Sequence, residues 1–226
     1  ARQIEDIEDA MPSFVKLAYL PKLGLVRLRL TAVGTDLEIL KKETDDIADV
    51  VAQRLGKHVV ARDDLSFEEI IVRTFAAKNL RLATAESCTG GNISTQITAV
   101  AGASQMFQGA AVVYSNQAKV DVLEVSASTL EAHGAVSEPT VVQMADGAKA
   151  VFHSDYAIAT SGIAGPSGGT PEKPVGMVCV AVAGRYETLS KTFYYKNDRA
   201  VNIQRATMAA LSMLWNLFQK EEAVKM

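Results

Sequence analysis

The sequence TAESCTGG, from Thr84 to Gly91, joins a short apolar run to a stretch with helical character. Residues 80–85 predict a strand and residues 92–99 predict a helix. The start of a helix carries a partial positive charge and leaves backbone N–H groups without partners. The two glycines let the backbone approach a ligand closely. We therefore hypothesise that Ser87 is a nucleophile and that the rest of the chain builds its pocket.

Composition narrows the class of protein. The chain has 226 residues, 48% of them apolar and 22% charged, which is typical of one or two globular domains. A net charge of -3, with lysines and arginines scattered, gives no support for binding to nucleic acid or to an anionic membrane. No apolar run is long enough to span a bilayer and no leader opens the chain, so we expect a cytoplasmic protein. The start at Ala1, inside a charged segment, is typical of a piece cut from a longer protein.

Metal and disulfide chemistry find no support in the two cysteines. Cys88 and Cys179 are too few for a metal cluster and do not resemble the framework of a secreted protein. We expect neither a metal nor a cofactor.

Residues 1–63 predict a small α+β module. Helical spacing over 1–11 is followed by an alternating pair of strands over 14–20 and 25–32, joined by a turn at 21–24. A helix is predicted over 36–55, ended by Gly56, and a third strand over 58–61. The module holds no cluster of catalytic residue types, so we interpret it as a structural or linking unit.

Residues 64–226 predict the larger domain. Ser66 and Glu69 have the spacing of a capping box and start a helix through residue 77. Apolar strands then alternate with helices, which favours a three-layer α/β/α domain with a mixed, mostly parallel sheet. The further strands are expected over 110–114, 155–160, 176–183 and 186–194, and the further helices over 126–133, 137–152 and 200–220.

Polar and glycine residues gather after three of these strands, over 87–91, 114–119 and 160–169. Ligands of open α/β sheets bind at the carboxyl ends of strands, so the three segments are expected to line one crevice. None of the histidines (His58, His133 and His153) lies there, but Lys119 does. A partly desolvated lysine can act as a base.

A Ser87–Lys119 pair, assisted by Tyr114 or Asn116, is therefore the main hypothesis. The alternatives are that Ser87 caps the following helix, that Lys119 is a solvated surface charge, and that Cys88 is the nucleophile with His133 as its base.

The glycine-rich segment 162–169 could hold a phosphate or stabilise an oxyanion, or it could be an ordered turn. It is not a P-loop, because the lysine that follows, Lys173, lies between Glu172 and Pro174. It also lacks the glycine spacing of a dinucleotide fingerprint. Arg199 offers a cation suited to a carboxylate or phosphate, with a surface ion pair as the alternative.

Four motifs, read together, resemble the CinA family of competence/damage-inducible proteins. They are AESCTGG at 85–91, YSNQAK at 114–119, HGAVSEP at 133–139 and SGIAGPSGG at 161–169. The resemblance runs from about residue 65 to the end and implies the C-terminal nicotinamide-nucleotide amidase domain of that family. It implies hydrolysis of nicotinamide mononucleotide to nicotinic acid mononucleotide and ammonia, with no metal or cofactor.

The resemblance also implies roles and partners. Ser87 and Lys119 match the family's catalytic serine and lysine, and Tyr114 and Asn116 fall in the same motif. The expected substrate-binding residues are Thr89, Gly90, Gly91, Thr160, Ser161, Gly162, Gly165, Gly168, Gly169 and Arg199.

Residues 14–32 look like the middle module of full-length relatives, whose N-terminal molybdopterin-binding-like domain is absent from this sequence. A homo-oligomer is a possible state. The alternative function is an inactive nucleotide-binding or regulatory module.

Overall fold

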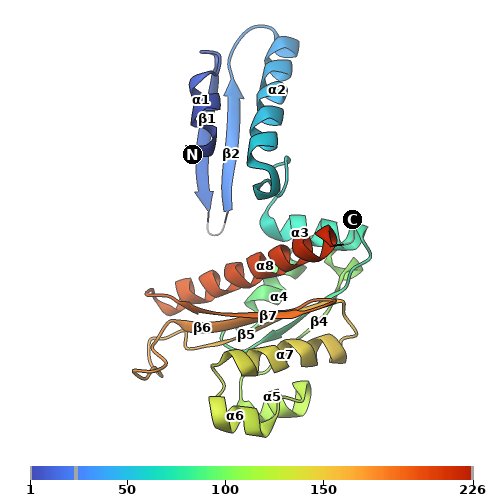
Figure 1. Ribbon diagram of the computed structural model, residues 1–226, viewed down its shortest axis with the longest axis vertical. Coiled ribbons are helices and arrows are strands. Elements are labelled where there is room, and N and C mark those ends of the chain that lie inside the picture. The colour runs from blue at the N-terminus through green and yellow to red at the C-terminus, as the bar shows by residue number, and fades with distance from the viewer. Residues whose placement is uncertain (1, 23–24, 225–226) are drawn as a thin grey trace. The chain divides into compact units, whose positions relative to one another are not determined.

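The computed structural model describes residues 2–22 and 25–224, and the chain divides into two compact units, Ala1–Leu65 and Ser66–Met226 (Figure 1). The division falls two residues after the boundary expected between 63 and 64. Each unit is described by itself.

The first unit is a hairpin with helices. A 3-10 turn η1 (Arg2–Ile4) leads into α1 (Glu5–Asp9), followed by the antiparallel strands β1 (Val15–Lys22) and β2 (Leu25–Ala32), then α2 (Leu37–Leu55) and a second 3-10 turn, η2 (Gly56–His58). Asp36 caps α2 by accepting hydrogen bonds from two backbone N–H groups, and Gly56, with φ 52°, follows its last turn. The turn predicted at 21–24 lies partly outside the described residues, and β1 runs on through Pro21.

The third strand predicted at 58–61 is wrong. His58 belongs to η2, and residues 59–61 form no strand. The N–H of Val59 donates to the carbonyl of Gly56 at 3.0 Å, a local turn bond in place of a bond between strands. The valines at 59 and 60 favour a strand, but the hairpin of this unit takes neither as a partner.

The second unit is a five-stranded sheet between helical layers. The strands lie in the order β4-β3-β5-β6-β7, with β4, β3 and β5 parallel and β6 antiparallel to both of its neighbours. Four strands thus run in one direction. The strand bounds are β3 Leu82–Glu86, β4 Phe107–Val112, β5 Tyr156–Gly162, β6 Met177–Ala183 and β7 Thr188–Tyr194.

Helices cover both faces of this sheet, so the three-layer α/β/α prediction is confirmed (Figure 1). One face carries α8 (Arg199–Ala223) with α3 (Phe67–Ala77) and α4 (Asn92–Thr98). The other carries α7 (Glu138–Val151), with α5 (Asn116–Leu123) and α6 (Ala127–His133) beyond it. A short 3-10 turn, η3 (Ala103–Gln105), precedes β4.

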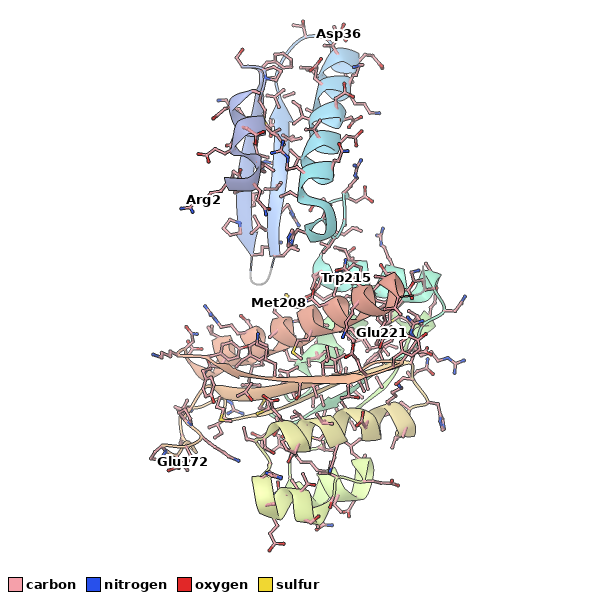
Figure 2. All side chains as sticks on the ribbon, viewed as in Figure 1. Arg2, Asp36, Glu172, Met208, Trp215 and Glu221 are labelled. Carbon is pink, nitrogen blue, oxygen red and sulfur yellow. The ribbon has the colours of Figure 1, made fainter. Side chains whose placement is uncertain are left out.

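Two apolar clusters hold the layers together. On the α8 face, aromatic rings of Phe75, Tyr156 and Phe218 lie 5.3–6.4 Å apart, and Tyr156 donates to the buried carboxylate of Glu221 at 2.5 Å. Figure 2 shows Glu221 on α8. On the α7 face the strands present small side chains, mainly alanines. Small residues let the helices lie close to the sheet and to one another. A Cβ on Gly147 of α7 would lie 2.1 Å from the carbonyl oxygen of Leu123 in α5.

The sequence prediction placed residues 115–119 at the end of a strand, and this is wrong. β4 ends at Val112, and residues 116–119 form the first turn of α5. Ser115 supplies the cause, because its side chain accepts a hydrogen bond from the N–H of Ala118 and so caps the helix. Lys119 therefore sits on a rigid helix.

Candidate active site

Ser87 is the first residue after β3, at the carboxyl end of an interior strand that lies between β4 and β5. Its N–H donates to the carbonyl of Thr160 at 3.0 Å, which continues the pairing of β3 with β5 for one more residue. Side chains alternate along a strand, and Ala83 and Ala85 belong to the cluster on the α7 face. Ser87 therefore points to that same face, where it is buried at 8% exposure.

Lys119 reaches Ser87 from α5. Its Nζ lies 3.2 Å from the Ser87 Oγ, and the side chain is 1% exposed. The interpretation of Lys119 as a solvated surface charge is therefore wrong. The same nitrogen contacts three backbone carbonyl oxygens, of Val113 at 2.9 Å, Tyr114 at 3.2 Å and Ser115 at 3.4 Å.

Burial lowers the pKa of the Lys119 amine below its ordinary value, because an ammonium loses hydration in this position. A neutral amine has two N–H groups and one lone pair. The two N–H groups can serve the surrounding carbonyls while the lone pair faces the hydroxyl of Ser87. The geometry thus suits a base that removes the proton of Ser87.

Cys88 is poorly suited to be the nucleophile. Its side chain is buried, and burial raises the pKa of the thiol to about 12, so little thiolate exists near neutral pH. His133 is exposed at the end of α6, and its backbone carbonyl accepts a hydrogen bond from Lys173 Nζ. Among the described residues, no hydrogen bond joins Cys88 to His133. The geometry therefore favours Ser87 over the alternative.

Glu86 occupies the donors at the start of α4. Its carboxylate accepts hydrogen bonds from the N–H groups of Gly91, Ile93 and Ser94 at 2.9–3.1 Å. The N–H of Gly90 donates to the carbonyl of Ser87. Both N–H groups are thus occupied within the protein, and the expectation that Gly90 and Gly91 bind substrate stays a prediction.

Two donors beside the nucleophile remain. The N–H groups of Cys88 and Thr89 carry no hydrogen bond to another residue in the described part of the chain. The side chain of Thr89 is engaged, because its Oγ1 lies 2.7 Å from the Oγ1 of Thr160 in a buried pair. Donors next to a nucleophilic serine are suited to stabilise an oxyanion.

Ser161 shares the face of Ser87. Residues 86 and 160 are partners in the parallel pairing of β3 with β5, so the residues that follow them are neighbours. Ala157 and Ala159 belong to the α7-face cluster, and alternation puts Ser161 on that face. Thr160 points to the opposite face, toward Thr89. Of these two expected binding residues, Ser161 lies on the face of the sheet that carries Ser87 and Lys119, which we call the dyad.

The glycine-rich segment forms a loop between β5 and β6. Backbone bonds from Ile163 to Met177 and from Gly176 to Ile163 close its base, and Lys173 Nζ ties it to α6. Figure 2 shows Glu172 on this loop at one end of the sheet. Gly162 ends β5, and Gly168 and Gly169 are exposed. The carbonyl of Gly165, not its N–H, faces a partner, the guanidinium of Arg199.

Arg199 connects this loop to the segment after β4. It is the first residue of α8, and it donates to the Gly165 carbonyl at 2.9 Å and to the Tyr114 hydroxyl at 3.2 Å. No carboxylate in the part of the chain that the structure describes pairs with Arg199, which removes the surface ion pair as an explanation. Its positive charge is thus available to an anion.

The assisting residues differ in their placement. Tyr114 contributes its backbone carbonyl to Lys119, but its hydroxyl faces Arg199. Asn116 is exposed in the first turn of α5, and the described hydrogen bonds do not join its side chain to Ser87 or Lys119. Neither side chain touches the dyad through a hydrogen bond, so their assistance stays a prediction.

Asn202 was missed from the sequence. It is fully buried in α8, where its Nδ2 donates to the carbonyls of Ala164 and Asn197 at 3.0 and 2.9 Å. It thereby holds the glycine-rich loop against the start of α8, one turn from Arg199.

Within residues 2–22 and 25–224, no group of three or more His, Cys, Asp or Glu side chains could hold a metal ion. In the same ranges, every helix is too short or too polar to cross a membrane.

The fold and this pair of side chains define a three-layer α/β domain with a buried serine–lysine pair at the carboxyl edge of its sheet. The family model of the CinA C-terminal domain matches residues 64–218. The chain belongs to the CinA family.

Relatives support this membership across both units. A CinA-like protein of Chlorobium limicola is 41% identical over 218 residues, covering 94% of this chain and 51% of the relative. A CinA-like protein of Cytophaga hutchinsonii is 40% identical over 214 residues, covering 95% of this chain and 51% of the relative. The chain thus spans about half the length of the curated relatives it matches.

Solved structures are similar over about two thirds of the chain or somewhat more. The competence/damage inducible protein CihA from Agrobacterium tumefaciens is 40% identical with a TM-score of 0.66, covering 67% of this chain and 93% of that one. A CinA superfamily protein from Escherichia coli is 29% identical with a TM-score of 0.65, covering 72% of this chain and 98% of that one.

Proposed function

We propose that this chain is a nicotinamide mononucleotide deamidase, which hydrolyses the carboxamide of its substrate to nicotinic acid mononucleotide and ammonia. The observation that carries the proposal is the contact between Lys119 Nζ and Ser87 Oγ at 3.2 Å, with both side chains buried. Membership of the CinA family and the four matching motifs support the choice of substrate.

The proposed reaction begins with attack on the amide. Lys119 takes the hydroxyl proton while the Ser87 oxygen bonds to the carboxamide carbon, and the carbonyl oxygen becomes an oxyanion. The free N–H groups of Cys88 and Thr89 stabilise that oxyanion, an effect of about 3–4 kcal/mol for a well-placed donor.

Two steps complete the turnover. The C–N bond breaks, Lys119 returns its proton to the leaving nitrogen, and ammonia departs from an acyl-enzyme ester on Ser87. A water molecule then attacks the ester carbon with Lys119 as its base, and the Ser87 oxygen leaves as a hydroxyl with that proton. The product is released as a carboxylic acid that loses its proton to solvent to give the carboxylate, and the enzyme returns to its starting state.

Substrate anchoring falls to the rim of the site. Arg199 has no carboxylate partner among the described side chains, so its charge supports a role in holding the phosphate of the substrate. The loop that carries Gly165 and the segment that carries Tyr114 meet at this guanidinium. The phosphate is thus expected at Arg199, and the carboxamide beside Ser87.

The test is release of ammonia from nicotinamide mononucleotide by the whole chain, followed with a coupled assay. We expect Ser87→Ala to abolish release and Cys88→Ala to keep it within a few-fold of the unchanged protein. Loss of release in Cys88→Ala with retention in Ser87→Ala would refute the serine mechanism. Tight binding of the nucleotide by the unchanged protein without turnover would favour the inactive nucleotide-binding module.

A further inference from the structure

Glu86 is a fully buried carboxylate directly before Ser87. As the last residue of β3 it points away from the face of Ser87, toward α4. Within residues 2–22 and 25–224, no lysine, arginine or histidine forms a salt bridge with it. An isolated buried carboxylate is costly, so the fold must compensate its charge in another way.

Backbone donors supply this compensation. Oε2 accepts from the N–H groups of Gly91 and Ile93 at 3.0 and 3.1 Å, and Oε1 accepts from the N–H and the hydroxyl of Ser94. The Ser94 hydroxyl also lies 2.9 Å from the Oγ1 of Thr84, back in β3. Charge-assisted bonds of this kind are about twice as strong as neutral ones.

These bonds fix both ends of the turn that carries the nucleophile. The carboxylate joins the end of β3 to the start of α4, with residues 87–91 between them. Gly91 is held at φ 97°, and Gly90, at φ 61°, donates to the carbonyl of Ser87. Between these two anchored ends, the N–H groups of Cys88 and Thr89 carry no hydrogen bond to another residue that the structure describes.

We infer that Glu86 is a positioning residue for the proposed reaction: it holds the Ser87 hydroxyl and the two free N–H groups in register for attack without touching the substrate. The inference rests on the proposed function for its substrate. A displacement of about 1 Å at a reacting group can cost 100-fold in rate. The role therefore predicts a loss in kcat much larger than any change in KM.

Glu86→Gln is the test, because it keeps the shape and replaces one acceptor oxygen by an NH₂ group that faces backbone donors. We expect kcat for nicotinamide mononucleotide to fall about 10- to 100-fold, with KM within about threefold. The matched control is Glu69→Gln. Glu69 accepts from the N–H of Ser66 in the capping box of α3, so the same change there removes a helix-start contact remote from Ser87.

A second measurement separates positioning from stability and from the choice of substrate. The rate constant for covalent labelling of Ser87 by a fluorophosphonate probe is measured at a temperature where circular dichroism shows each variant folded. Slower labelling of Glu86→Gln than of Glu69→Gln supports the inference. This holds even if the unchanged protein does not hydrolyse nicotinamide mononucleotide, which would overturn the proposed function alone. Labelling and kcat of Glu86→Gln at the level of the control would overturn the inference.

Discussion

Replacing Lys119 by methionine removes the amine and keeps an unbranched side chain in the same buried space. The change takes away the amine that lies 3.2 Å from Ser87 Oγ, which is the proton acceptor of the proposed reaction. A positioned general base typically contributes a factor of about 10² to 10⁴ in rate, which corresponds to roughly 3–5 kcal/mol in activation free energy. We expect a loss of kcat in this range.

The free energy of unfolding should change far less. The carbonyls of Val113, Tyr114 and Ser115 lose a common donor, and an unsatisfied buried acceptor costs about 1–3 kcal/mol. The variant also no longer buries an ionisable amine, which offsets part of that cost. We expect a net change in the free energy of unfolding below about 2 kcal/mol.

The assay is single-turnover release of ammonia from nicotinamide mononucleotide, with urea unfolding measured on the same samples. Lys149→Met is the matched control, since Lys149 is partly buried in α7 and donates to a backbone carbonyl, of Gly184, remote from the site. Lys149→Met should keep its rate. If Lys119→Met kept more than a tenth of the original rate while folded, the assignment of Lys119 as the base would be refuted.

Four further predictions follow from named contacts. Burial lowers the pKa of Lys119, so kcat/KM should rise with pH through that lowered pKa and level off above it; a flat profile from pH 6 to 10 would contradict this. Because Lys119 binds its proton more tightly in the unfolded chain, the free energy of unfolding should rise with pH between the lowered pKa and 10.5. Urea titrations of Lys119→Met should not show this rise. Arg199→Met should raise KM for nicotinamide mononucleotide at least tenfold but leave kcat/KM for the phosphate-free riboside unchanged. Equal losses of kcat/KM for both substrates would contradict the assignment of Arg199 to the phosphate. Gly147→Ala should destabilise by about 1–3 kcal/mol, in contrast to the usual gain for alanine in a helix, because its Cβ meets the Leu123 carbonyl; thermal unfolding at or above the original midpoint would contradict the close approach of α5 and α7.

Local signals in the sequence predicted most of the fold. The capping box at Ser66 and Glu69 forms as expected, because both of its hydrogen bonds join groups three residues apart. The prediction of a third strand at 58–61 was wrong for the opposite reason. A strand needs a partner supplied by a distant segment, and residue propensity alone does not reveal whether that partner exists.

The dyad was predictable because it combines a reactive hydroxyl and a lysine that both follow predicted strands. The hydrogen bonds that compensate the buried charge of Glu86 were not predictable. The carboxylate accepts from Gly91, Ile93 and Ser94 only when the end of β3 and the start of α4 come together in the fold. Asn202 was hidden for the same reason. Its amide is an ordinary polar side chain until α8 lies against the loop that carries the Ala164 carbonyl.

Both cysteines of the chain are buried, and burial raises the pKa of each thiol. Peroxides and electrophiles attack thiolates, so neither side chain offers a ready target for oxidation. An amidase that relied on Cys88 would lose activity whenever its surroundings became oxidising. The proposed reaction at Ser87 and Lys119 uses no thiol, so we expect the proposed turnover to persist under oxidative stress and to be unchanged by maleimide or hydrogen peroxide.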